Sequence, residues 1–132
     1  MSIINDVVMA VMGMAQAAVD GYTLHRGPLL PGPDISMEPD PSGAQTYFFD
    51  KNAVYSLGLV FNGKSQDMAK ITGDLGRVQG YLTRSHYYPA GQAWQILRIL
   101  PQSTPAMIER QDDGYWVYAC SVSVEFYYRG DD

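Results

Sequence analysis

Apolar and polar residues alternate through the C-terminal segment, residues 114–130 (GYWVYACSVSVEFYYRG). Alternate positions form one apolar row: Trp116, Tyr118, Cys120, Val122, Val124, Phe126 and Tyr128. Because successive side chains of a strand point to opposite faces, the pattern predicts a long strand with one buried face. About fourteen residues would span roughly 45 Å, well beyond the usual strand length. We therefore expect this strand to be central to an antiparallel sheet or to continue into a partner.

The N-terminus has a helical period instead. Apolar residues recur at three- and four-residue spacing across residues 2–19, which predicts a helix with a broad apolar face. Ser2 is a suitable N-cap, and Asp6 places a negative charge in an early turn, where it is favoured. A face this broad packs in a core or against a neighbouring subunit.

Residues 20–44 are rich in Pro and Gly and have no sustained helical period. Because Pro fixes φ and lacks an amide donor, this stretch predicts an extended, irregular arm. Within the arm, residues 34–37 have the composition of a short strand. A long irregular segment in a compact domain is typically functional or docked on another surface.

Two short strands follow, at residues 46–50 and 53–61, with a turn at Lys51-Asn52 between them. Asn62-Gly63 is a turn sequence. A helix over about residues 66–84 comes next, because apolar residues recur there at alternating three- and four-residue steps. Its N-cap is Ser65, and it contains three glycines for which close backbone packing is one reason: Gly73, Gly76 and Gly80.

The last third predicts a strand at residues 93–100, a turn bracketed by Pro101 and Pro105, and a strand at residues 106–111. The latter pairs with the final strand through an Asp-Asp-Gly turn at residues 112–114, since Gly supplies the positive φ of tight hairpins. The fold class is therefore α+β: one domain, residues 1–132, with a largely antiparallel sheet, two helices on one face, and the proline-rich arm between helix and sheet.

Charge and cysteine content narrow the possible functions. The formal net charge of −5 argues against non-specific DNA binding as the main task. The single cysteine, Cys120, lies in the apolar row, so we expect it to be structural rather than reactive. No basic region of a signal peptide and no apolar run of roughly 20 residues is present, so we expect a protein of a cytoplasm without a membrane partner.

Residues 58–65, GLVFNGKS, match the phosphate-loop pattern formally and lie between a predicted strand and a predicted helix. A phosphate loop is a compact cradle of backbone amides around an anion. Here the residues between the two glycines continue the alternation of the strand. We therefore interpret this segment as a strand that ends in an Asn-Gly turn, and keep nucleotide binding as an alternative.

No catalytic, cofactor or metal site is predicted. His25 and His86 lie near Gly- or Pro-containing loops, outside any nucleophile motif. The acidic residues of the arm lack the spacing and glycine of an EF-hand: Asp34, Glu38 and Asp40. The aromatic residues are too numerous for one small core, and a subunit interface would accommodate the excess.

Several short motifs resemble the small minor capsid or tail terminator proteins of long-tailed bacteriophages. After the N-terminal helix comes a Leu-Pro-containing arm, residues 29–33, and then the Ile-Ser-Met segment at residues 35–37. A strand, a capped helix and the Trp-Gln-Ile strand at residues 94–96 follow, before a closing aromatic strand that ends in Val-Glu-Phe-Tyr-Tyr at residues 124–128.

The resemblance implies a non-enzymatic virion protein that forms a hexameric ring at the head-proximal end of the tail tube. The ring would end tube polymerisation, contact the tail tube protein and the head connector, and let DNA pass without specific binding. The protein would assemble in the cytoplasm of the bacterial host. The arm and the final strand would supply subunit or partner contacts, through Leu29, Leu30, Ile35, Met37, Tyr47, Phe48, Phe49, Tyr127 and Tyr128. A head-completion adaptor of the same junction is the alternative.

Overall fold

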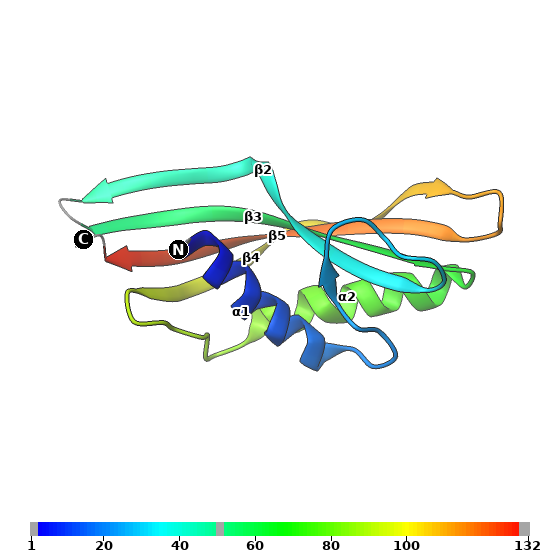
Figure 1. The fold of residues 1–132 in the computed structure, drawn as a ribbon, viewed down its shortest axis with the longest axis horizontal. Helices are drawn as coiled ribbons and strands as arrows, with labels where there is room; N and C mark the ends of the chain where they lie inside the picture. The colour runs from blue at the N-terminus through cyan, green and yellow to red at the C-terminus, as the bar shows by residue number, and fades with distance from the viewer. Residues whose placement is uncertain (1–2, 50–51, 130–132) are drawn as a thin grey trace.

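The computed structural model describes residues 3–49 and 52–129. Two helices and five strands follow one another along the chain (Figure 1): α1 (Ile3–Ala18), β1 (His25–Arg26), β2 (Asp34–Phe49), β3 (Asn52–Ser65), α2 (Met68–Arg84), β4 (Trp94–Arg110) and β5 (Trp116–Arg129). The strands form one sheet in the order β1-β2-β3-β5-β4, in which only the β1–β2 pair is parallel. The predicted α+β class is confirmed.

The long C-terminal strand is central in the sheet, which is one of the two alternatives that its length predicts. β5 lies between β3 and β4 and pairs with both along its length. The side chains of its apolar row that face the helices include the fully buried Val122, Val124 and Phe126. The predicted hairpin that leads into it is also present, because Gly114 has a φ of 88° and its amide donates to the carbonyl of Gln111.

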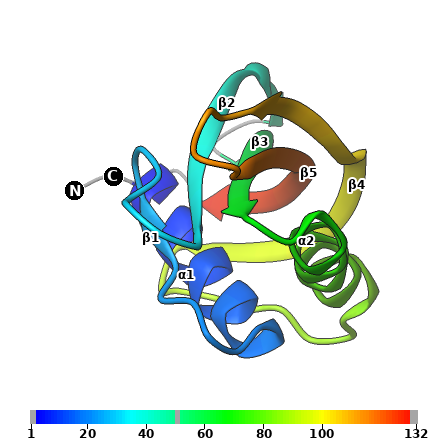
Figure 2. The same cartoon turned by 90° about the vertical axis from the view of Figure 1, so that its right-hand side faces the viewer.

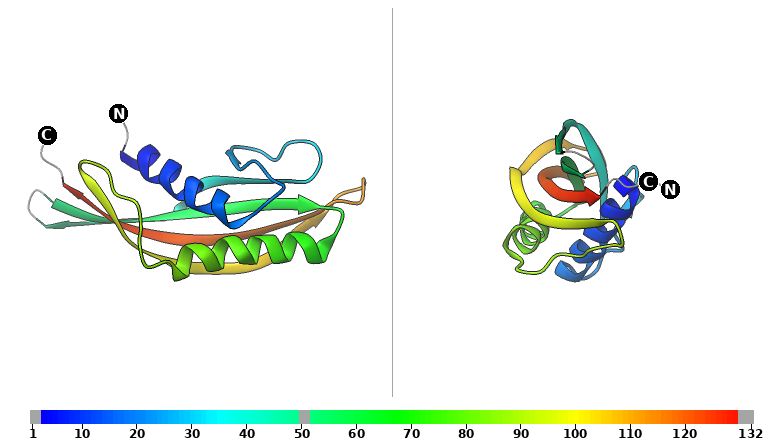
Figure 3. Two further views of the ribbon diagram at one scale, coloured as in Figure 1. Left: turned by 90° about the horizontal axis from the view of Figure 1, so that it is seen from below. Right: turned by 90° about the vertical axis from the view of Figure 1, so that its left-hand side faces the viewer.

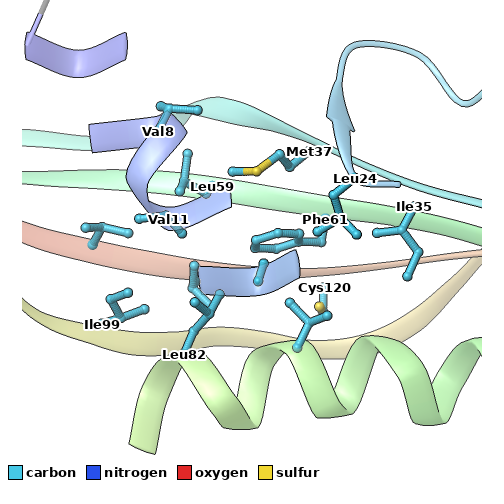
Figure 4. Close-up of a cluster of buried hydrophobic side chains, with 14 of the residues drawn as sticks. Val8, Val11, Leu24, Ile35, Met37, Leu59, Phe61, Leu82, Ile99 and Cys120 are labelled. Carbon is cyan, nitrogen blue, oxygen red and sulfur yellow. The ribbon is translucent and has the colours of Figure 1, made fainter. Parts of the chain in front are cut away.

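Both helices cover the same face of the sheet (Figure 3, left). The sheet is strongly curled when viewed end-on (Figure 2), and α1 and α2 lie side by side beneath it. Their apolar stripes meet the inward-facing strand residues in one core (Figure 4), whose largest fully buried side chains include Phe61, Phe126, Ile35, Met37, Leu59, Ile71 and Leu75. Burial of this apolar surface stabilises the helix-on-sheet layer.

The structure corrects the turn predicted at Asn62-Gly63. Both residues lie inside β3, where Gly63 pairs with Ile35 of β2 and with Tyr118 of β5. The predicted helix begins at Met68, and its N-cap is Asp67, whose side chain accepts a hydrogen bond from the amide of Lys70. A two-sided strand pairing thus overrides the local turn preference of Asn-Gly.

The turn predicted between Pro101 and Pro105 is also absent. β4 runs continuously from Trp94 to Arg110, with register shifts on either side of Ser103. The reason is position, since β4 is an edge strand and an edge strand tolerates the missing amide donor of Pro.

The short strand predicted at residues 34–37 and the strand predicted at residues 46–50 belong to one strand, β2, which begins at Asp34. Residues 34–44, predicted as part of the arm, are thus in the sheet, and β1 lies within the remaining stretch. A register shift separates Asp40 from Gln45. β1 pairs with β2 only at Ser36 and Met37, so Pro39 and Pro41 lie where β2 has β3 on one side alone among the described strands. The predicted turn at Lys51-Asn52 falls partly outside the described residues, and β3 begins at Asn52.

Candidate subunit interface

The nine residues predicted to contact partners are not one surface. Ile35 and Met37 are fully buried in the protein's own core, because they point from β2 toward the helices, and so they offer no side-chain surface to a second subunit. Leu30 is 53% exposed, and Leu29 is half-buried beside it. Tyr127 and Tyr128 are half-buried near the end of β5.

The remaining three predicted residues, Tyr47, Phe48 and Phe49, form the end of β2. Their backbones pair with β3 at Val54, Ala53 and Asn52. At these three residues β2 therefore forms one edge of the sheet among the described strands, and β4 forms the other edge.

A set of polar contacts, which we call the polar clasp, holds the loop at residues 27–33 that contains Leu30. The Nε2 atom of His25 lies 2.7 Å from Oδ2 of Asp34, and the same oxygen accepts a hydrogen bond of 2.8 Å from the amide of Leu30. Arg26 reaches Glu38 at 3.5 Å and donates to Asn5 of α1 at 3.0 Å. The clasp ties both ends of the loop at residues 27–33 to the sheet.

The hydrogen bond to Asp34 raises the pKa of His25 above its ordinary value of 6.5, although desolvation opposes the shift. A raised pKa in the folded state contributes stability below the ordinary value, and that contribution is lost as pH rises through the folded value. We expect His25→Ala to cost about 0.5–1 kcal/mol at about pH 5.5 and less at about pH 8.5, measured by denaturant unfolding. His86→Ala, at an exposed histidine, is the control. An equal cost at both pH values would contradict the clasp.

Sequence reasoning missed the exposed apolar residues of β4. Leu97 is 48% exposed, Leu100 37%, Met107 53% and Ile108 61%. Alternation could not assign them, because the register shifts of β4 break the period-two relation between sequence and face. Large apolar side chains along an edge strand indicate a surface that another chain covers.

A side chain of α2 forms hydrogen bonds with the backbone at the register shift in β4. Gln79 is buried, and its amide nitrogen donates to the carbonyl of Ser103 at 2.6 Å and to the carbonyl of Ser121 at 2.9 Å. The hydroxyls of the two serines lie 2.8 Å apart. One side chain thus joins the helix, the edge strand and the central strand at the register shift.

We expect Gln79→Ala to lower the free energy of unfolding by about 1–3 kcal/mol, because two carbonyl groups lose their donor. Gln79→Leu keeps most of the packing volume but not the donor, so it should lose a similar amount in the same denaturant titration. Full stability of the Leu variant would show that packing, and not the hydrogen bonds, is what Gln79 supplies.

The phosphate-loop pattern does not form a loop. Residues 58–65 are all in β3, and their backbone pairs with β2 and β5. Amides that face two neighbouring strands cannot converge on one anion. Lys64 is buried, and its ammonium lies 5.3 Å from the centroid of the Tyr115 ring. The geometry therefore does not support nucleotide binding at this segment.

Two further expectations concern Cys120 and the glycines of α2. Burial raises the pKa of Cys120 to about 12, which fits a structural thiol. A Cβ at Gly73 or Gly76 would meet nothing within 4 Å, so packing inside this chain does not require them. Together with Gly80 and Arg77 they line an open groove of about 620 Å³.

Among the side chains that the structure describes, no cluster of three or more His, Cys, Asp or Glu is placed to hold a metal ion.

No protein-family model and no curated protein sequence matches the chain. Solved structures do resemble it. A chain from a structure described as the virion of a native gene transfer agent (GTA) particle superposes with a TM-score of 0.67, covering 92% of this chain and 97% of that chain. The two chains share one fold. Their sequences are 9% identical, so the likeness concerns the fold alone.

None of the helices described here has the length and apolar character needed to cross a bilayer.

Proposed function

We propose that this protein is a structural virion protein of a phage-type particle that acts through its surfaces and not by catalysis. The observation that carries the proposal is the fold, which nearly the whole chain shares with a chain of a gene transfer agent virion. The exposed apolar residues of β4 support it, because an assembly protein keeps such residues for contacts that only the assembled particle completes.

Within such a particle, we propose that the protein forms a tail terminator ring at the head–tail junction, with the tail tube on one face and the head connector on the other. A closed ring repeats one heterologous interface and has two unlike faces. The net charge of −5 favours DNA passage through the ring without sticking. The sequence resemblance to phage terminators points the same way, and a hexamer is the expected ring.

Two measurements test this function. Sedimentation and electron microscopy of the purified chain should show rings, and a protein that stays monomeric even with tail tubes added would contradict the proposal. Particles assembled without the protein then separate the roles. Overlong tails identify a terminator, whereas tails of normal length beside separate heads identify a head-completion adaptor instead.

A further inference from the structure

The helices and the outer strands give the molecule two distinct flanks. The segment from α1 to β2, residues 3–49, forms one flank, with α1 packed on β2 and β1 beside it. α2 and β4, residues 68–84 and 94–110, form the other flank, with α2 packed on β4. β3 and β5 separate β2 from β4 in the sheet, and Figure 2 shows α1, β1 and β2 on the left and α2 and most of β4 on the right.

The two flanks carry opposite formal charge. Residues 3–49 have one basic residue, Arg26, and five acidic ones, which gives a charge of −4 with histidine neutral: Asp6, Asp20, Asp34, Glu38 and Asp40. Residues 68–84 and 94–110 have two acidic residues, Asp74 and Glu109, and five basic ones, which gives a charge of +3: Lys70, Arg77, Arg84, Arg98 and Arg110. We call these surfaces the acidic flank and the basic flank. A chain with a net charge of −5 thus has one positively charged side.

Much of this charge lies at the surface. Asp20 is exposed on the acidic flank, and Arg84 and Arg110 are exposed on the basic flank. The other three basic side chains of the basic flank are more than half exposed, although each also forms an ion pair within the chain. Charges of opposite sign on two sides of a molecule draw the acidic flank of one copy toward the basic flank of another and keep like flanks apart.

Exposed apolar side chains accompany the charges on both flanks. On the acidic flank they are Ile4, Met9 and Leu30. On the basic flank they are Met68, Tyr81, Leu97, Leu100, Met107 and Ile108. Apolar groups at the centre of an interface supply affinity, whereas charged groups decide which surfaces meet. Both flanks therefore have the two kinds of group that a contact between copies needs.

The main chain of β4 is already partly paired on its outer edge. The amide of Gly91 donates to the carbonyl of Trp94, and the amide of Ile96 donates to the carbonyl of Pro89. Ala90 also forms a bridge with Gln95. A second copy therefore meets this part of the basic flank through side chains and not by adding a strand.

We propose that the acidic flank of one copy packs against the basic flank of a second copy, head to tail, all around the ring. This inference rests on the proposed ring and specifies its repeated interface. A heterologous contact joins two unlike surfaces of the same chain, and the two flanks lie on opposite sides of the molecule, as such a ring requires. Two-fold pairing of either flank with itself would instead place like charges opposite each other.

An exchange of charge between the flanks tests the contact. The basic-flank variant combines Arg84→Glu, Arg98→Glu and Arg110→Glu, and the acidic-flank variant combines Asp6→Lys, Asp20→Lys and Asp40→Lys; each reverses the sign of its flank. Alone, either variant should need about tenfold or more protein to form rings in analytical ultracentrifugation, because flanks of like charge then meet.

Mixing the two variants is the decisive step. Equal amounts of both should restore rings at the wild-type concentration, because the reversed flank of each variant is complementary to the reversed flank of the other. The two variants should alternate, so native mass spectrometry should find equal numbers of both in every ring. Recovery on mixing also shows that both variants fold.

Asp112→Lys combined with Asp113→Lys is the matched control. These residues lie in the turn between β4 and β5, outside both flanks, and their replacement shifts the net charge in the same direction as the acidic-flank variant. The control should assemble like the wild type. If a triple variant unfolds at a lower temperature than the wild type, Arg84→Glu and Asp20→Lys, both at exposed side chains, repeat the exchange with one charge on each flank.

The outcomes separate the two proposals. Rings that form from either flank variant alone at the wild-type concentration would overturn the inference and leave the ring function standing. A mixture of folded variants that forms no rings would overturn it as well, because the two flanks would then not face each other. A wild-type chain that forms no ring, even with tail tubes added, would overturn both proposals.

Discussion

Replacing Gly63 with Val is expected to lower the free energy of unfolding by about 2–3 kcal/mol. A Cβ at Gly63 would lie 2.7 Å from Cδ1 of Ile71 and 3.3 Å from Cδ2 of Leu75. Both side chains are fully buried between α2 and the sheet, so they would have to shift within a close-packed core. Denaturant unfolding followed by circular dichroism measures the loss, which is a large share of the stability of a small domain.

A double-mutant cycle isolates the contact. Ile71→Val deletes the Cδ1 atom, so Gly63→Ala should cost less in that background than in the wild type. Gly76→Ala is the control for glycine replacement in general, because a Cβ there meets nothing and Ala is the better helix former, so stability should rise by up to about 1 kcal/mol. An equal cost of Gly63→Ala in both backgrounds would show that the contact with Ile71 is not the cause.

Asp74→Ala is expected to lower the free energy of unfolding by about 2–3 kcal/mol at neutral pH. The buried carboxylate accepts hydrogen bonds from the Tyr22 hydroxyl at 2.7 Å, from Lys70 at 2.8 Å and from Arg77 at 3.0 Å. Tyr22 belongs to the segment after α1, so this cluster joins that segment to α2. Because Lys70 and Arg77 are largely exposed, solvent screens their ion pairs with Asp74, and most of the loss comes from the buried groups left without partners.

The loss of unfolding free energy caused by Asp74→Ala should depend on pH. Burial alone would raise the pKa of Asp74, but the hydrogen bonds from Lys70 and Tyr22 outweigh it, and the pKa lies below its ordinary value of 3.8. A lowered pKa in the folded state adds stability above the ordinary value, and this addition is lost as pH falls through the folded value. The difference between wild type and Asp74→Ala should therefore shrink between about pH 7 and about pH 3. Asp20→Ala, at an exposed aspartate, should show no such change.

The predictions that depend on local sequence were correct, and those at positions where distant strands control the backbone were wrong. The helix of residues 3–18 and the turn at residues 112–114 follow from local sequence, and the structure has both. The turns predicted at Asn62-Gly63 and at residues 101–105 failed, because neighbouring strands and an edge position decided these backbones. Leu97 escaped notice for the same reason, since a register shift sets its exposure.

The sequence by itself determined the α+β class, the long final strand with its apolar row, and the apolar faces of both helices. These follow from periodicity, because a side chain's face is fixed by its spacing along a regular element. Only the tertiary structure decided that Gly63 admits α2 against β3, that Ile35 and Met37 belong to the core, and that β4 runs without interruption along an edge of the sheet. Such properties depend on which distant strands become neighbours, and no local pattern encodes that choice.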